Sequence, residues 1–494
     1  MEYKWKALSV TSVGSLMAAV DSTIVLLALL PMAEDLHSDF IVMVWVIVAY
    51  LLINTAFVLS LGRIGDMYGR KRMYNAGFMV FTVGSVLCGI SSDAIMLVGF
   101  RAVQGFGAAL LTANSFAILT EAFPPRERGR AFGVNAIVWG VGSILGIVLG
   151  GVIITFTTWR FIFLINLPIG LFGTYWAYRT LHRSVRLSEM ETFDLVAAAT
   201  FTLGLLSLLM GVTWGLIYSW SDLPVLVLFI LAPIFLFGFV VWEKRYSKDP
   251  IVDLAMFRNR VFAASITTAA LQSLSLFSVN FLLVFYLEGI AGLDILTAAY
   301  LVVPTAAMTA AVGPFGGILS DRIGGRIVAT VGLIVQLAAL LTLSTLTTTS
   351  TLLEVGVIEA FFGLGAGLFW PANTSTIMSA SPPNRYGVSS GVMNTFRNTG
   401  MVMSFALSLI VLTSTIPATI VYQLFVGNLS GGLSHALADS YLSGQELTLR
   451  VSALLLVGAT VLSALRGEAR PQSYGPPSLP RGGGGQDDKS VHAK

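Results

Sequence analysis

The stretch GRIGDMYGRKR, residues 62–72, places five charges in eleven residues of a chain in which only 11% of residues are charged. The chain has 494 residues, of which 55% are hydrophobic, and its mean hydropathy is +0.81. Soluble domains carry about 25% charged residues. This composition therefore indicates that lipid rather than water surrounds most of the protein, and that the charged stretch connects apolar segments.

Apolar runs of about 20 residues, the length that crosses a bilayer as a helix, recur along the chain. Short polar connections separate them, so the sequence predicts an all-α polytopic membrane protein with about fourteen spans. The first run is longer than a signal-peptide core and precedes no small-residue cleavage site, so we expect it to remain as a helix. The expected spans are residues 7–32, 41–62, 73–90, 94–121, 129–154, 159–181, 193–214, 222–243, 261–289, 296–319, 326–346, 351–378, 388–414 and 450–466.

The distribution of charge predicts the orientation of these spans. With the N-terminus inside, the inner connections carry most of the basic residues, including Arg70 and the arginines of residues 126–130. The outer connections carry mainly acidic residues such as Asp35. By the positive-inside bias, we expect a multi-pass protein of the cell membrane with both termini in the cytoplasm. The basic residues of the opening stretch then anchor the topology, but this interpretation does not explain Asp66.

The opening stretch recurs later in the chain as GILSDRIGGR, residues 317–326. The alignment pairs Gly62 with Gly317 and Asp66 with Asp321, and RAVQGFGAAL aligns with EAFFGLGAGL at nearly the same offset. Two parallel repeats of six helices, with two further helices between them, account for this pattern. The predicted domains are an N-terminal six-helix bundle (1–186), two additional helices (187–250), a C-terminal six-helix bundle (251–466) and a disordered cytoplasmic tail (467–494).

Several stretches carry a resemblance to a known family. GRIGDMYGRKR matches a loop motif that follows helix 2, and RAVQGFGAA (101–109) matches a helix 4 motif. DSTIVLLALLP (21–31) and WRFIFLINLPIG (159–170) match signatures of helices 1 and 6. Together they resemble the major facilitator superfamily, and within it the fourteen-helix drug:proton antiporters. GSILGIVLGG (142–151) is similar to the helix 5 antiporter motif, but Ile147 stands where that motif has proline.

The resemblance implies the major facilitator fold and a secondary transporter that works by alternating access. It implies proton-coupled export of amphipathic small molecules, as in multidrug efflux, by a monomer that is not an enzyme. The proton is the expected coupling ion, and no other cofactor, metal or nucleic acid is expected. No Walker loop, Cys-x-x-Cys or His-Glu-x-x-His motif occurs in the sequence, so ATP-driven pumping is not expected. Because of Ile147, uptake or facilitated transport of a metabolite stays open, as does a non-transporting receptor or scaffold.

Few ionisable side chains lie inside the expected spans, where they are costly. Asp21, in the middle of the first span, either caps a break in the helix or carries the coupled proton. Arg101 and Glu359 occupy equivalent repeat positions, so they form an ion pair or proton relay, or they reach separately towards lipid headgroups. Arg397 is too deep to reach headgroups and is expected to pair with a carboxylate. We favour Asp21 as the proton site, since a pair with Arg101 keeps Glu359 ionised.

Asp66 predicts a contact between the two bundles. A helix N-terminus carries about +0.5 charge and free N–H groups, so Asp66 can bind the start of the helix near Gly387 while Arg70 bridges Asp66 and Glu121. Asp321 should make a weaker copy of this contact, because no arginine stands at the position of Arg70. In its place only Arg322 or Arg326 can substitute. The expected latch consists of Gly62, Asp66, Gly69, Arg70, Glu121, Asp321 and Arg326.

The remaining candidates are polar or aromatic residues at similar depth, and closely spaced glycines. Lipid-facing positions account for most aromatic residues of this kind. The expected substrate cavity contains Gln104, Asn114, Asn280, Phe277, Phe281, Trp370 and Asn394. The glycines expected at close helix contacts are Gly142, Gly146, Gly150 and Gly151. Residues 415–449 are expected to form a long outer loop before the last span.

Overall fold

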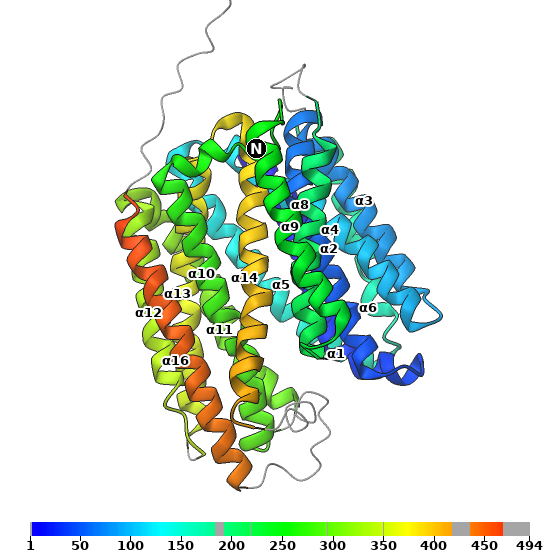
Figure 1. The fold of residues 1–494 in the computed structure, drawn as a ribbon, viewed down its shortest axis with the longest axis vertical. Coiled ribbons are helices and arrows are strands. Elements are labelled where there is room, and N and C mark those ends of the chain that lie inside the picture. Colours follow the sequence, from blue (N-terminus) through cyan, green and yellow to red (C-terminus); the bar gives the residue numbers. More distant parts are fainter. Residues whose placement is uncertain are drawn as a thin grey trace, which may run out of the picture.

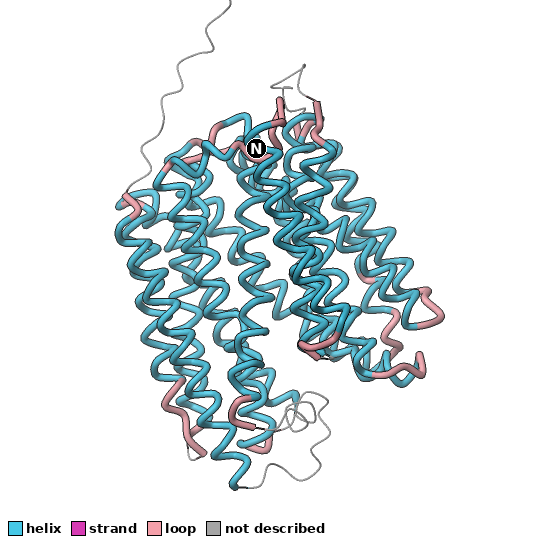
Figure 2. Tube along the Cα trace, viewed as in Figure 1, coloured by secondary structure: helices cyan, strands magenta, loops and turns pink. Residues whose placement is uncertain are grey.

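The computed structural model describes residues 2–182, 192–217, 219–293, 295–348, 350–416 and 435–467. These residues form helices joined by turns, without a β-strand among them (Figure 2). The helices are α1 (Tyr3–Asp35), α2 (Phe40–Tyr68), α3 (Arg70–Gly89), α4 (Ala94–Ala122), α5 (Arg128–Phe156), α6 (Phe161–Leu164), α7 (Asn166–Thr180), α8 (Leu195–Ile217), α9 (Leu223–Arg245), α10 (Arg260–Phe285), α11 (Ile295–Ile323), α12 (Gly325–Leu343), α13 (Leu352–Ser379), α14 (Tyr386–Thr413) and α16 (His435–Leu465).

Each of the fourteen predicted spans corresponds to a helix, with the sixth divided into α6 and α7. Within the described ranges, twelve helical segments are long and apolar enough to cross a membrane. The remaining two predicted spans are α3, which packs on α4 and α7, and α10, which packs on α14 and α16. The protein is therefore an all-α polytopic membrane protein, as the sequence predicts.

Local signals set the helix ends. Gly69 and Gly324, which are equivalent in the repeat, follow α2 and α11 with φ values of +103° and +98°. Residues with a side chain rarely adopt this left-handed backbone. At the other end of the fold, Asp93 caps α4, and Thr351 and Glu354 form a capping box at the start of α13. Glu354 therefore has a structural role at a helix end.

Helices α1–α7 pack together, as do α10–α14 and α16, and the α8–α9 hairpin contacts both bundles. Helix α8 contacts α2 of the first bundle and α14 of the second. Leu205 and Leu209 of α8 bury their side chains beside Leu52 of α2 and pack near Val402 of α14. The hairpin therefore covers one side of the line along which the bundles meet (Figure 1).

The bundles meet closely at one end of the molecule, the end where α1 begins, and diverge towards the other end (Figure 1). We call the first the closed end. A β-carbon on Gly62 of α2 would overlap the carbonyl oxygen of Gly387 of α14, and one on Gly129 of α5 would overlap that of Gly317 of α11. These two pairs bring the backbones of opposite bundles into direct contact.

The last helix begins earlier than the sequence predicts. Helix α16 begins at His435, so the predicted loop over residues 415–449 is wrong for its second half. The polar residues of this stretch lower its hydropathy, but Tyr441 and Leu449 are fully buried, and the Tyr441 hydroxyl donates a 2.7 Å hydrogen bond to Leu282 O of α10. The predicted boundary at residue 186 and nearly all of the predicted tail lie outside the described residues.

Candidate functional site

A buried polar network joins four helices of the first bundle around Asp21 of α1. Arg101 Nη1 and Gln104 Nε2 of α4 each donate to the Asp21 carboxylate at 2.8 Å. Asn166 Nδ2 of α7 donates to the same carboxylate at 3.2 Å, and Ser85 of α3 accepts from both amides. Three donors, one of them the cationic guanidinium of Arg101, therefore face this carboxylate and compensate for its burial.

The partner of Arg101 is therefore Asp21, and the predicted ion pair between Arg101 and Glu359 is wrong. The repeat places Arg101 and Glu359 at equivalent depths, but each faces the interior of its own bundle. The Arg101 guanidinium also donates to Val46 O at 2.9 Å and lies 4.4 Å from the ring centre of Tyr50. These contacts hold Arg101 within the first bundle, which also excludes the alternative that it reaches lipid headgroups.

Glu359 of α13 is fully buried and has far fewer partners than Asp21. Its Oε2 accepts a hydrogen bond from Thr305 Oγ1 of α11, while its Oε1 has no hydrogen-bond partner among the described residues. No salt bridge to Glu359 occurs in that part of the chain either. Val355 and Phe362 on the same helix are buried in the surrounding apolar core. Glu359 is thus a buried carboxyl group without a counter-charge.

Arg397 of α14 does not have the predicted carboxylate partner within the described ranges. Its Nε lies 3.5 Å from Asn398 Oδ1, at the limit of hydrogen bonding, and its guanidinium carbon lies 5.7 Å from the ring centre of Trp370 on α13. The side chain is half-buried. A deep guanidinium with one weak acceptor and an aromatic neighbour can accept an anion from outside the protein.

The predicted contact of Asp66 is present at the closed end. The Asp66 carboxylate accepts hydrogen bonds of 2.9 Å from the backbone N–H groups of Gly387 and Val388, at the start of α14. Arg70 donates to Asp66 at 2.8 Å and to Glu121 at 2.8 Å, which is the predicted bridge. Arg70 also donates to Pro383 O, so this arginine itself joins the two bundles.

The symmetric contact of Asp321 is also present. Its carboxylate accepts from the N–H groups of Gly129 at 2.8 Å and Arg130 at 3.0 Å, at the start of α5. The predicted substitute cation is wrong: neither Arg322 nor Arg326 forms a salt bridge with Asp321 in the described part of the chain. Arg326 is the second residue of the next helix, α12, and Gly325 stands at the position that Arg70 has in the first copy.

The sequence missed another bridge at the closed end. Arg128 Nη2 donates to the Tyr386 hydroxyl at 3.0 Å, and the guanidinium groups of Arg70 and Arg128 lie 5.5 Å and 5.3 Å from the Tyr386 ring centre. Tyr386 therefore sits between two arginines of the first bundle. In the repeat alignment Arg128 is equivalent to Tyr386, since each directly precedes one of the paired glycines Gly129 and Gly387. This equivalence is the sequence feature that indicates the bridge.

The family model described as Major Facilitator Superfamily matches residues 11–405. The chain belongs to the major facilitator superfamily. It is 30% identical to the riboflavin transporter RibZ of Clostridioides difficile over 424 residues. This alignment covers 86% of this chain and 90% of that protein. It is 28% identical to multidrug resistance protein 3 of Bacillus subtilis over 79% of this chain and 76% of that one.

Solved structures of the superfamily share the fold. The human organic anion transporter MFSD10 (TETRAN) superposes with a TM-score of 0.65 at 14% identity, over 93% of this chain and 99% of that chain. The chain is also 25% identical to the tetracenomycin C resistance and export protein of Streptomyces glaucescens, over 96% of this chain and 94% of that protein. This superfamily member is therefore a multi-pass membrane transporter, which removes the receptor or scaffold alternative.

The predicted cavity residues of this transporter divide into different environments. Gln104 belongs to the Asp21 network, and Asn114 packs against Gly65 at the contact between α4 and α2. Asn394 Nδ2 donates to Ser390 O in its own helix. Phe277 packs on Phe405, whereas Trp370 lies beside Arg397. The side chains of Asn280 and Phe281 lie outside the described part of the structure.

The predicted packing glycines lie on α5, and three of them contact α1. A β-carbon on Gly142, Gly146 or Gly150 would meet Ala19, Thr23 or Ile24 of α1, whereas Gly151 faces open space.

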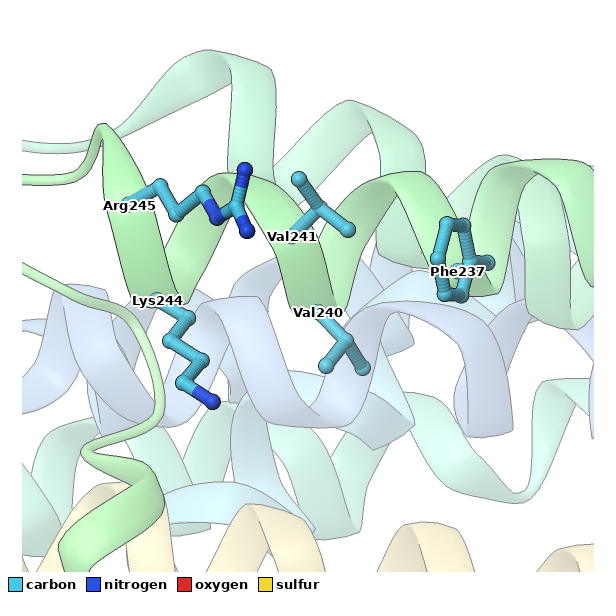
Figure 3. Close-up of a pocket in the computed structure, with 5 residues that line it drawn as sticks. All are labelled: Phe237, Val240, Val241, Lys244 and Arg245. Carbon is cyan, nitrogen blue, oxygen red and sulfur yellow. The ribbon is translucent and has the colours of Figure 1, made fainter.

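A surface depression of about 460 Å³ lies elsewhere, and all its lining residues come from α9 (Figure 3). Because all its lining residues lie on α9, the depression is on the outer surface of this helix and is separate from the buried carboxyl groups. It is lined by Phe237, Val240, Val241, Lys244 and Arg245.

Proposed function

We propose that this protein is a proton-coupled secondary transporter of the cell membrane, which exports amphipathic small molecules by alternating access. Two of its relatives are named for multidrug resistance and for tetracenomycin C resistance and export, and these names support export. The buried ionisable groups support coupling to an ion, because such groups inside a membrane protein are costly and serve transport.

The closed end is cytoplasmic in this proposal, with both chain termini on that side. It carries Arg70 and the arginines of residues 126–130, as the positive-inside bias requires. The described conformation is then closed towards the cytoplasm. Asp66 and Asp321 act as two carboxylate latches, each binding the N-terminus of a helix in the opposite bundle, and both must release before the substrate can enter from the cytoplasm.

The observation that carries proton coupling is the difference between Asp21 and Glu359. Asp21 has Arg101 as a counter-charge, whereas Glu359 is fully buried with Thr305 as its hydrogen-bond donor. An ionised carboxylate without a cation is strongly disfavoured in a dry interior. Glu359 therefore holds a proton in this conformation, and it releases that proton when water or the substrate reaches it. This assignment replaces the expectation that Asp21 is the main proton site.

Asp21 has a second role in the proposal. The Asp21–Arg101 pair links helices of the first bundle, so it can respond to the state of the transporter without being the group that carries the proton. The Asp21 network spans α1, α3, α4 and α7, whereas Glu359 and Thr305 join α13 to α11. Among the described residues, each bundle thus has a buried carboxyl group at its core.

Transport into proteoliposomes under an imposed pH gradient tests the proposal. The purified full chain is screened with cationic dyes, neutral drugs and anionic metabolites. We expect movement of at least one class to follow the gradient in the wild type, and to become independent of the gradient in Glu359→Gln. Accumulation that ignores the pH gradient in the wild type would contradict proton coupling.

A second candidate function is uptake or facilitated transport of a metabolite on the same fold. The relative named as a riboflavin transporter favours a metabolite as cargo, and Ile147 stands in the helix 5 motif where the antiporter branch has proline. The same assay separates the two candidates, since reversal of the pH gradient reverses accumulation in an antiporter. Downhill equilibration that is equal under both gradients would favour facilitated transport.

A further inference from the structure

We propose that Arg397 and Trp370 form the recognition site for the substrate, and that this substrate is a planar aromatic acid whose anionic group binds the guanidinium. The inference rests on the proposed transport function and specifies its substrate class. It follows from the hydrogen-bond partners of the buried arginines, from the position of Arg397 above the closed end, and from the chemistry of the pair.

Arg397, which is half-buried, differs from the buried arginines whose partners are known. Arg101 is neutralised by Asp21. Arg466, at the end of α16, donates to Asn373 Oδ1, to Ser265 Oγ at 3.1 Å and to Gly325 O at 2.8 Å. Arg397 has only the 3.5 Å contact with Asn398. A guanidinium has five N–H donors, so most donors of Arg397 have no protein acceptor in the described residues.

The position of Arg397 places it on the side of α14 that is turned towards the first bundle. Ser390, on the same helix, donates its hydroxyl hydrogen to Thr112 O of α4 in the opposite bundle at 3.2 Å. Residues seven apart share one face of a helix and lie about 10 Å apart along it. Arg397 therefore lies on the face of α14 that looks towards the first bundle, about two turns beyond the contact at the closed end.

The chemistry of the pair selects the ligand. A guanidinium binds a carboxylate or similar planar anion through two parallel N–H···O bonds. The Trp370 indole, which is half-buried beside it, offers a flat face on which an aromatic ring can stack. An anion on such a ring satisfies the donors of Arg397 and neutralises its charge, whereas a cationic ligand of the same shape adds like charge. The site therefore discriminates by charge between ligands of equal size.

Two xanthene dyes of opposite charge test this inference. Fluorescein is an anion and rhodamine 123 is a cation on the same three-ring frame. Binding of each dye to the detergent-solubilised full chain is measured by fluorescence anisotropy, and transport is measured separately in proteoliposomes. The variants are Arg397→Gln, Arg397→Lys and Trp370→Leu. Arg450→Gln is the matched control, since Arg450 is an exposed arginine that pairs with Glu446 on α16.

We expect the wild type and Arg450→Gln to bind fluorescein at least tenfold more tightly than rhodamine 123. Arg397→Gln should lose at least tenfold in fluorescein affinity, with rhodamine binding unchanged or improved, and Arg397→Lys should recover part of the loss. Trp370→Leu should weaken both dyes. Equal loss of both dyes in Arg397→Gln, or tighter binding of rhodamine by the wild type, would overturn the inference.

The two assays separate this inference from the proposed function. Charge-selective binding that depends on Arg397 supports the recognition site even if no pH gradient drives dye movement, in which case proton coupling is what fails. Gradient-driven transport of rhodamine but not fluorescein supports the transport function and overturns the recognition site. A folded Arg397→Gln protein, shown by an unchanged gel-filtration profile and melting temperature, excludes misfolding as the cause of lost binding.

Discussion

Asp66 Oδ1 lies 2.9 Å from the backbone nitrogen of Gly387, which is 321 residues further along the chain and in the other bundle. The equivalent distance between Asp321 Oδ1 and Gly129 N is 2.8 Å. Each carboxylate thus binds two backbone N–H groups at the start of a helix, where the helix dipole favours negative charge. The duplication of the chain has produced two copies of one contact, and both hold the closed end together.

Neutralising the first copy should open the closed end. In Asp66→Asn, one of the two N–H groups at the start of α14 loses its acceptor, and Arg70 loses one of its two carboxylate partners. A hydrogen bond to a charged group contributes about 1.5–3 kcal/mol, so we expect the labelling rate of Ser390→Cys to rise about tenfold or more. Ser390 is buried at the bundle contact, and Cys88→Ala provides a background without the natural cysteine. An unchanged labelling rate would contradict the latch.

The second copy should matter less. Asp321 binds the same kind of helix start, but no described arginine bridges it as Arg70 bridges Asp66. Asp321→Asn therefore leaves no buried cation without a partner, and we expect about a two- to threefold increase in the same labelling assay. If Asp321→Asn opened the closed end more than Asp66→Asn, the asymmetry between the two latches would be wrong.

The glycine contact can be tested without changing charge. Gly62→Ala places a β-carbon against the carbonyl oxygen of Gly387, so the bundles must separate there. We expect faster labelling of Ser390→Cys with no loss of melting temperature, because alanine favours a helix by up to about 1 kcal/mol. Gly151→Ala is the control, since its β-carbon would meet open space. Equal labelling in both variants would argue against the contact.

The contacts at the closed end were predictable because they depend on local features that the repeat displays twice. A carboxylate four residues before an arginine, at the end of an apolar run, can be placed at a helix end from sequence alone. The duplicated stretch then identifies its partner by symmetry. The substitute role of Arg326 failed because this residue aligns with Lys71, whereas Gly325 stands at the position of Arg70.

The partner of Arg101 could not be predicted, because sequence gives the depth of a residue in the membrane and not the helix that it faces. Asp21 and Arg101 lie on α1 and α4, whose packing depends on the whole bundle. Asn166 was missed although it is the single polar side chain in FIFLINLPIG, residues 161–170. The start of α16 was missed because its residues have low hydropathy. Their burial against α10 stabilises the helix, and the sequence of this segment alone does not show that contact.

The Asp21 and Arg101 pair should behave as a unit in stability measurements. Asp21→Asn leaves a buried guanidinium without its carboxylate, and breaking a buried pair in this way costs about 3–5 kcal/mol. Asp21→Asn combined with Arg101→Gln removes both charges and should melt at a higher temperature than Asp21→Asn alone. Melting curves of the two single variants and the double variant complete the cycle. Additive effects would show that the two side chains do not interact.

The central claim is that Glu359 couples proton movement to substrate movement, and a direct measurement is proton flux driven by substrate. Proteoliposomes contain a trapped pH indicator, and a transported dye is added with no initial pH gradient. In the wild type, the account predicts that protons move opposite to the dye. In Glu359→Gln the dye should still equilibrate, while the internal pH stays constant. Proton movement of equal size in Glu359→Gln and the wild type would contradict the account.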